Sequence, residues 1–222
     1  MGANVGIFLE RKKAATVVDE IWAQLRRLIL QGTLVPGTRL VELDIAAQTG
    51  ASQGSVREAL QRLERDGLVV RRGRNGTFVT EVSPAEMHEI FRIRGVVESC
   101  AIRRLARRVR PEQLEELREL VERMREAGRA GDTVAVVGHD MAFHQRICAW
   151  AEHPILLRVW TLLHGQLERF LVIYDASHFA DLTTVADNHL PILEALEAGD
   201  ADAAAERIER HVMIGAPPES LD

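Results

Sequence analysis

Apolar residues recur at helical spacing through the first third of the chain, and two short β-rich runs follow. The spacing of every three or four positions predicts helices over residues 16–31, 43–49 and 52–66. The runs LVVRR and TFVT then flank Gly73-Arg74-Asn75-Gly76, and an Asn-Gly pair between such runs predicts a hairpin. Three helices followed by a hairpin are the order of a winged helix-turn-helix domain.

A strong helix start divides this domain from the rest of the chain. Ser83 suits an N-cap, Pro84 the first helical position and Glu86 the third. We therefore predict a winged helix-turn-helix domain over residues 1–81 and a second domain over residues 82–222. The apolar pattern of the second domain predicts an all-helical bundle of about six helices, so the fold class is mainly α. These helices cover residues 84–109, 111–128, 132–151, 154–175, 182–198 and 200–214, and Pro191 is expected to kink the fifth or to lie in its first turn.

The charge of the chain is unevenly distributed. Residues 1–80 hold 12 Lys and Arg against 8 Asp and Glu, whereas the remainder holds 16 against 25. A basic first domain joined to an acidic second one suggests a polyanionic partner for the first. Cys100 and Cys148 form no disulfide framework, and no apolar stretch approaches the roughly 20 residues that cross a bilayer. We therefore expect a cytoplasmic protein with no membrane partner.

The predicted helix over residues 52–66 carries polar side chains opposite its apolar stripe. Gln53, Arg57 and Gln61 are four residues apart, and amide and guanidinium groups bind base edges and phosphates in a major groove. Further cations follow along the hairpin at Arg71, Arg72 and Arg74. The alternative is a solvated charged face, but the order of helices and hairpin favours DNA binding.

The segment around these residues resembles a known family. QGTLVPGTRLVELDIAAQTGASQGSVREALQRLERDGLVVRRGRNGTFV is similar to the winged head of the GntR family of bacterial transcription regulators. The elements PG-x-RL and S-x-x-x-VREAL-x-RLE-x-DGLV are specific in combination. The resemblance implies DNA contact before the second helix, at the recognition helix and at the tip of the wing. The residues are Arg39, then Gln53, Gly54, Ser55 and Arg57, then Arg74, Asn75 and Gly76.

This chain departs from the family at Gln53, where Arg is usual after the Ser of the motif. Arg favours guanine whereas Gln favours adenine, so the operator sequence does not carry over. Ser55 and Glu58 also offer an alternative capping box, which would start the helix three residues later.

Asp140 and His144 lie four residues apart on a predicted helix, so their side chains point to the same side. His189 and His211 follow on two later helical segments, and one carboxylate with three imidazoles is a ligand set for a divalent transition metal. For any single histidine, an ordinary core or surface position is the simpler interpretation. That interpretation is kept for His88, His139, His153, His164 and His178.

The second domain also resembles a known family. IRGVVESCAIRRLAR, HDMAFHQRICAWAEHPIL, NHLPILEALEAGD and ERHV are similar to the helical effector domain of the FadR subfamily, called the FCD domain. The resemblance spans residues 84–214 and implies metal binding by Asp140, His144, His189 and His211. Zn²⁺ is the first choice for this set, with Ni²⁺, Mn²⁺ or Fe²⁺ as the others.

Coordination positions left open on such an ion suit the oxygens of a small carboxylate or hydroxy acid. Arg94 matches the R-x-x-L-E element of the family and is the candidate to balance the charge of this effector. The alternative is an Arg94–Glu98 pair on a solvated helix face.

Together these patterns predict a homodimeric DNA-binding transcription regulator rather than an enzyme. Its metal-centred body would bind a small organic acid, and two heads related by a twofold axis would read a palindromic operator in double-stranded DNA. The alternative is a metal-dependent hydrolase or lyase in which the same ligands activate water. The sequence has no HExxH motif and no general base tied to the ligands by a motif. A third hypothesis is a regulator whose pocket holds no metal.

Overall fold

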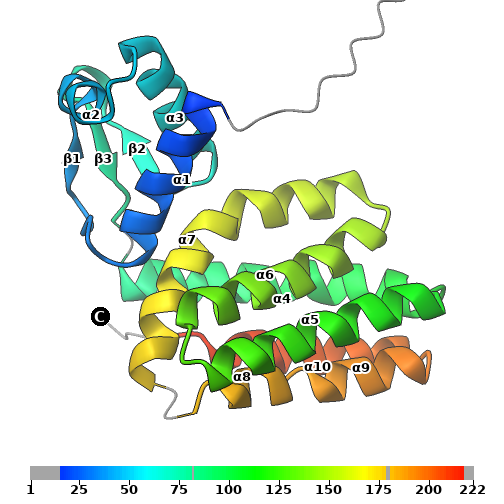
Figure 1. The fold of residues 1–222 in the computed structure, drawn as a ribbon. Helices are drawn as coiled ribbons and strands as arrows, with labels where there is room; N and C mark the ends of the chain where they lie inside the picture. Colours follow the sequence, from blue (N-terminus) through cyan, green and yellow to red (C-terminus); the bar gives the residue numbers. More distant parts are fainter. Residues whose placement is uncertain (1–15, 82, 179–180, 218–222) are drawn as a thin grey trace, which may run out of the picture.

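The computed structural model describes residues 16–81, 83–178 and 181–217, without the side chains of Arg74 and of residues 173–178. A small head, residues 16–81, lies against a larger helical body, residues 83–217 (Figure 1). Each part has its own cluster of buried apolar side chains. The fold is mainly α, with a winged helix-turn-helix followed by a helical bundle, as predicted.

The head consists of three helices and a three-stranded antiparallel sheet. The helices are α1 (Val17–Leu30), α2 (Glu42–Thr49) and α3 (Gln53–Arg65), and the strands are β1 (Arg39–Leu40), β2 (Val69–Arg71) and β3 (Thr77–Val79). β3 lies between β1 and β2, and the predicted hairpin is the β2–β3 pair. A short 3-10 helix, Gly73–Asn75, lies in the hairpin loop. The sequence does not predict β1, because two residues are too few for a periodic pattern.

Ser52 sets where the recognition helix α3 begins. Its side-chain oxygen accepts a hydrogen bond from the backbone N–H of Ser55 at 3.1 Å, as an N-cap residue does. The alternative start at Ser55 is therefore wrong, and Gln53 and Gly54 belong to the first turn. The opposite face of α3 is buried against α1 through Val56, Ala59, Leu60 and Leu63.

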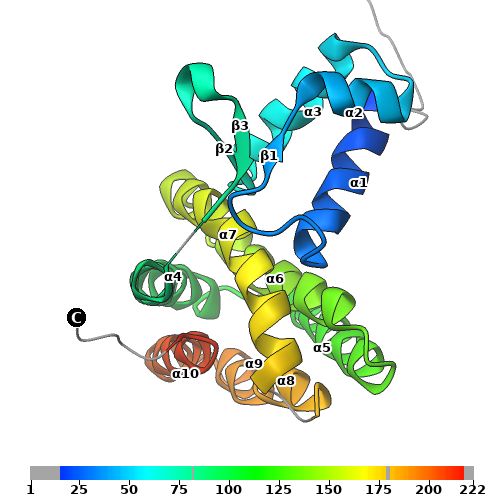
Figure 2. The same ribbon diagram turned by 90° about the vertical axis from the view of Figure 1, so that its left-hand side faces the viewer.

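Seven helices form the described part of the body. They are α4 (Pro84–Ala106), α5 (Pro111–Arg129), α6 (Thr133–Trp150), α7 (Pro154–His178), α8 (Thr183–Asp187), α9 (Leu190–Glu197) and α10 (Ala201–Ile214). α10 packs along α4, α5 lies beside α6 and α8, and α7 crosses both α4 and α6 (Figure 2). The rings of Phe91, Phe143 and Trp160 are fully buried in the core between them.

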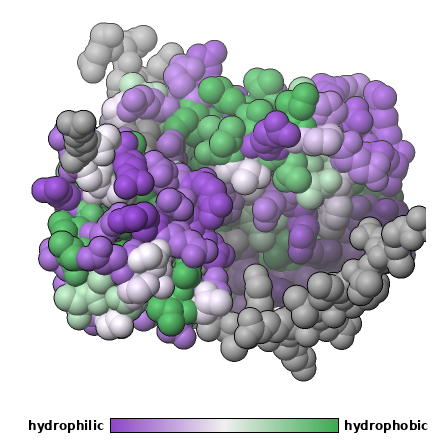
Figure 3. All heavy atoms as spheres, turned by 90° about the horizontal axis from the view of Figure 1, so that it is seen from above, coloured by the Kyte–Doolittle hydropathy of each residue, from purple (hydrophilic) through white to green (hydrophobic). Residues whose placement is uncertain are grey.

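The surface seen from above is mostly hydrophilic, with separate hydrophobic patches between the polar side chains (Figure 3). Within the described ranges, no helix combines the length and the apolar character needed to cross a bilayer.

The structure has two helices where the sequence predicts one over residues 182–198. α8 ends at Asp187 and α9 begins at Leu190, so the body has seven helices rather than six in its described part. Pro191 lacks the N–H that a continuous helix would direct at the carbonyl of Asp187, and its ring clashes with that carbonyl. The backbone N–H of His189 donates to the carbonyl of Ala186, and the Nδ1 atom of the same residue donates at 2.8 Å to the carbonyl of Val185, which a continuous helix would pair with that backbone N–H. His189 therefore lies in the interruption, outside regular helix.

Replacing Ser52 by Ala removes the side-chain acceptor at the start of α3. We expect the free energy of unfolding of the head to fall by about 1 kcal/mol, whereas Ser55→Ala should have a clearly smaller effect. Urea unfolding of the two full-length variants, followed by circular dichroism, compares them. A larger loss for Ser55→Ala would mean that the helix starts at Ser55 after all.

Candidate metal centre and DNA-reading surface

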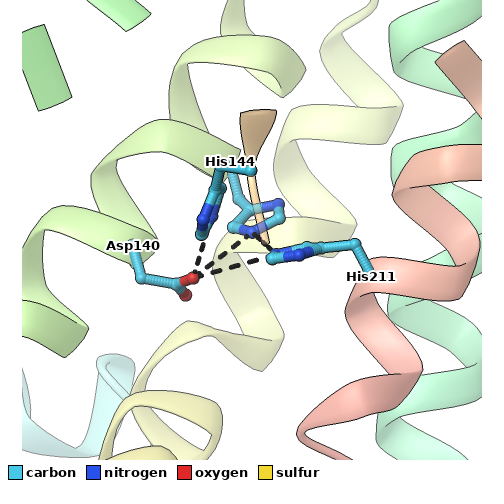
Figure 4. Close-up of side chains that lie close together, drawn as sticks. Asp140, His144 and His211 are labelled. Carbon is cyan, nitrogen blue, oxygen red and sulfur yellow. Dashed lines mark hydrogen bonds and ion pairs between the residues drawn. The ribbon is translucent and has the colours of Figure 1, made fainter. Parts of the chain in front are cut away.

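Four potential metal ligands converge in the interior of the body. Asp140 and His144 come from α6, His189 from the interruption before α9, and His211 from the last turn of α10. One ligand atom from each lies within 4.8 Å of the others. Figure 4 shows the side chains of Asp140, His144 and His211 pointing toward one another. The fold thus brings together the four residues that the sequence singles out.

The separations between these atoms resemble those of ligands that share one ion. Asp140 Oδ1 lies 3.1 Å from His189 Nε2, 3.6 Å from His144 Nε2 and 4.0 Å from His211 Nε2. The Nε2 atoms of His144 and His211 are 3.1 Å apart. Around an ion with bonds of about 2.1 Å, neighbouring ligand atoms are roughly 3.0 to 3.5 Å apart.

Hydrogen bonds behind two of the imidazoles orient their Nε2 atoms toward the centre. His144 Nδ1 donates to Glu98 Oε2 at 2.5 Å, and His189 Nδ1 donates to the carbonyl of Val185 at 2.8 Å. A proton on Nδ1 leaves the lone pair of Nε2 available to a metal. Both rings are therefore held in the tautomer that a metal ligand needs.

Glu98 of α4 lies at the centre of a buried network behind His144. It is fully buried, and it accepts hydrogen bonds from Arg94 Nε and Trp160 Nε1, each at 2.7 Å. Burial raises the pKa of Glu98, but the charges and hydrogen bonds of Arg94 and His144 outweigh this and bring the pKa to about 2. The alternative prediction of an Arg94–Glu98 pair is right about the pair but wrong about its position. The two residues pair in the buried core and not on a solvated helix face.

The buried charges of the site leave an excess of negative charge. Burial raises the pKa of Asp140, but His144 and His189 hold it well below its usual range. Burial and the nearby imidazoles of His189 and His144 place the pKa of His211 well below its usual range, so this ligand is neutral. The two ionised carboxylates, of Asp140 and Glu98, thus face the single guanidinium of Arg94. A bound cation would balance the remaining negative charge.

The excess of negative charge also acts on His144. Burial lowers the pKa of this imidazole, but the negative charges of Glu98 and Asp140 raise it by more than burial lowers it. The net shift of the pKa is therefore upward. A positive charge is therefore favoured between the two carboxylates, and either a proton or a metal ion can supply it.

A cavity of about 30 Å³, room for about two water molecules, adjoins the ligands. Arg94, Asp140 and His211 line it together with apolar side chains. Among the described residues, Arg94 Nη2, Asp140 Oδ2 and His211 Nδ1 are buried without a hydrogen-bond partner. Since buried polar atoms nearly always have a partner, the residues present fit a metal ion and polar groups bound next to it.

The predicted DNA contacts lie at α3 and at the wing of the head. Gln53, Gly54 and Arg57 are exposed on α3, and Ser55 is partly exposed. Asn75 is exposed at the wing, and the side chain of Arg74 lies outside the described residues.

The strand β1 brings Arg39 beside the wing. A Cβ atom on Gly76 would lie 3.2 Å from Arg39 Nε, and the φ of 107° at Gly76 is one that other residues rarely adopt. Arg39 and Gly76, far apart in the sequence, are therefore neighbours.

Glu42 of α2 links the recognition helix to the wing. Its Oε2 accepts from Arg57 Nη2 at 2.8 Å, and its Oε1 lies 3.9 Å from Arg71 Nη2. The hydrogen bond from Arg57 lowers the pKa of Glu42. Sequence reasoning missed this pair because the two residues are 15 positions apart on different helices. A DNA phosphate would have to compete with Glu42 for Arg57.

Both halves of the chain match known families. Residues 17–79 match the bacterial regulatory proteins of the gntR family, and residues 89–213 match the FCD domain. The probable D-xylose utilization operon transcriptional repressor of Paenarthrobacter nicotinovorans is 34% identical over 94% of this chain and 91% of its own length. The gluconate operon transcriptional repressor of Bacillus licheniformis is 28% identical over 86% of this chain and 79% of its own length.

A solved structure supports the same assignment. E. coli McbR/YncC has a TM-score of 0.73 and 27% sequence identity, covering 90% of this chain and 95% of that one. These relatives are transcription regulators and not enzymes, so the hydrolase or lyase alternative is contradicted. The resemblance in the sequence is confirmed, and the chain belongs to the GntR family of bacterial DNA-binding transcription regulators, with an FCD domain as its body.

Proposed function

We propose that this regulator holds a divalent metal ion at Asp140, His144, His189 and His211. The observation that carries the proposal is the convergence of four ligand atoms within 4.8 Å, one of them from the buried carboxylate of Asp140, next to the second buried carboxylate of Glu98. Three nitrogen ligands and one oxygen ligand suit Zn²⁺ first, and Ni²⁺, Mn²⁺ or Fe²⁺ as well. When bound, the ion would supply a Lewis acid for the oxygen atoms of an effector.

A small carboxylate or hydroxy acid is the effector that we propose for this centre. Arg94 Nη2 is buried beside the cavity, 3.8 Å from Asp140 Oδ2, where it can bind the carboxylate of an acid. Asn188, His211 and Ile214 line both this cavity and an outer cleft of about 580 Å³. An acid larger than two water molecules would therefore extend past these side chains toward the cleft. By their names, two relatives repress D-xylose and gluconate operons, so sugar-derived acids are the first to test.

We further propose that the protein is a cytoplasmic homodimer, with each chain divided at residues 81 and 82. Two heads would read a palindromic operator in double-stranded DNA, with half-sites about 34 Å apart. Large apolar side chains exposed on the body, such as Val96 at 60% and Leu162 at 65%, support contact between copies. The DNA contacts of each head are Arg39, Gln53, Gly54, Ser55, Arg57, Arg74, Asn75 and Gly76.

Replacing His144 or His211 by Ala should release the metal. Loss of even a hydrogen-bond partner behind a ligand weakens metal binding by about 10- to 100-fold, so loss of a ligand should weaken it at least as much. Metal analysis of the purified full-length proteins measures the effect. His139→Ala, on the same helix but outside the cluster, is the control and should keep the metal. Equal metal content in all four proteins would exclude the site as described.

Replacing Arg57 by Ala should weaken DNA binding by about 5- to 150-fold, the range for one side chain that contacts DNA. Glu42→Gln should preserve or tighten binding, because it removes the carboxylate that competes for Arg57. Mobility shifts on a duplex selected by the wild-type protein from random sequences measure both. Arg118→Ala on α5 is the control for loss of a surface cation. An unchanged shift with Arg57→Ala would contradict the assignment.

Binding of the acid should depend on the metal and on Arg94. Glycolate, lactate and gluconate, tested one at a time, should raise the melting temperature of the metal-loaded protein; an acid at 100 times its Kd adds about 2.7 kcal/mol. Arg94→Lys keeps the positive charge but loses the planar guanidinium that can donate two parallel hydrogen bonds to a carboxylate. This variant should therefore bind the acid more weakly and still retain the metal. Equal stabilisation of the metal-free protein would show that the ion takes no part.

A further inference from the structure

Helix α7 connects the metal centre with the head. Both ribbon views place the head against it (Figures 1 and 2). Trp160, His164 and Glu168 are four residues apart on α7 and therefore share one side of the helix, which we call the α7 face. Trp160 is fully buried and Glu168 is 4% exposed.

One end of the α7 face reaches the network behind the metal ligands. Trp160 Nε1 donates to Glu98 Oε1 at 2.7 Å, while Glu98 Oε2 accepts from His144 Nδ1 at 2.5 Å. The ring of His164 lies edge-on to Trp160, with centroids 5.1 Å apart, and its Nδ1 lies 3.9 Å from Glu168 Oε2. A continuous series of contacts therefore runs from His144 to Glu168.

The other end of the α7 face holds helix α1 of the head. Glu168 forms an ion pair with Arg26 of α1. A carboxylate buried this deeply depends on its cation, because it has lost most of its contact with water. The position of α1 on the body is thus tied to Glu168.

The end of α3 rests on the same stretch of α7. A Cβ atom on Gly165 would overlap the carbonyl oxygen of Asp66, so only glycine allows this approach. The carboxylate of Asp66 in turn accepts a hydrogen bond from Trp22 Nε1 of α1 at 2.7 Å. The recognition helix and α1 are therefore seated together, next to Glu168.

We propose that the α7 face transmits the state of the metal centre to the DNA-reading head, with Trp160 and Glu168 as positioning residues. This inference rests on the proposed metal function. His144 would hold the ion through Nε2, and the polarised ring would then change the hydrogen bond from its Nδ1 to Glu98, the carboxylate that also accepts from Trp160. A shift of Trp160 is carried along the helix to Glu168 and Gly165, where the head is seated. The position of the head on α7 is thus the equilibrium that metal binding and DNA binding would both shift.

Hydrogen exchange of the full-length protein, measured by mass spectrometry with and without Zn²⁺, tests the inference. In the wild type, Zn²⁺ should slow exchange in α6 and α10, and it should change exchange in α1 and residues 60–67 by about fivefold or more. A response in α6 and α10 with none in α1 would overturn the inference and leave the metal function standing. No response anywhere would overturn the metal function and this inference with it.

Two variants test the route itself. Trp160→Phe keeps an aromatic ring, although a smaller one, and loses the N–H donor, whereas Glu168→Gln keeps the shape but loses the charge that pairs with Arg26. Both should keep the response in α6 and α10 and lose most of the response in α1. Trp160→Phe provides a separate test if Glu168→Gln unseats the head, because Trp160 belongs to the buried core of the body. A full response of α1 in Trp160→Phe would contradict the route.

Matched controls exist for each kind of change. Glu116→Gln removes a carboxylate that pairs with Arg146 on the outside of the body at 2.6 Å, and it should respond like the wild type. Gly165→Ala should abolish the response in α1 because its Cβ pushes Asp66 away. Gly138→Ala, a helical glycine with no atom near its added Cβ, should leave the response intact. Equal responses from the two glycine variants would contradict the role of the seat.

Discussion

The excess of negative charge buried between α4, α6 and α10 is the constraint on which the body depends. Asp140 and Glu98 are removed from water, and Arg94 neutralises only one of them. Buried carboxylates of this kind persist only when hydrogen bonds and opposite charges surround them. The imidazoles from α6, α10 and the α8–α9 interruption, and the indole of Trp160, surround them here. The packing of these helices and the charge balance of the site therefore depend on the same side chains.

Local patterns in the sequence account for most of the helices and for part of the site. The capping box of Ser83 and Glu86 is present as predicted, and Asp140 and His144 share a helix face as their spacing requires. The convergence with His189 and His211 is a property of the tertiary fold, and only the family resemblance pointed to it. Spacing alone does not bring distant helices together.

Other features were beyond the sequence for identifiable reasons. The spacing of Arg94 and Glu98 is the same for a surface pair and a buried one, and only the helices packed around α4 decide between them. Trp160 looks like an ordinary core aromatic until its N–H is seen to donate to Glu98. Pro191 predicts a disturbance of the helix over residues 182–198. The sequence does not predict that the imidazole of His189 takes the place of a backbone N–H at the carbonyl of Val185, because this depends on the three-dimensional arrangement.

The four ligands also have a consequence for the unfolded chain. They span residues 140 to 211, and the stretch between the first and the last of them includes the five-residue helix α8 and the eight-residue helix α9. An ion shared by them would act as a cross-link that closes two long loops, much as a disulfide does, and it would lower the entropy of the unfolded state. Short helices that are marginal by themselves would then be fastened at both ends of the stretch that contains them. Occupancy of the centre would in this way govern how often the C-terminal third of the chain opens.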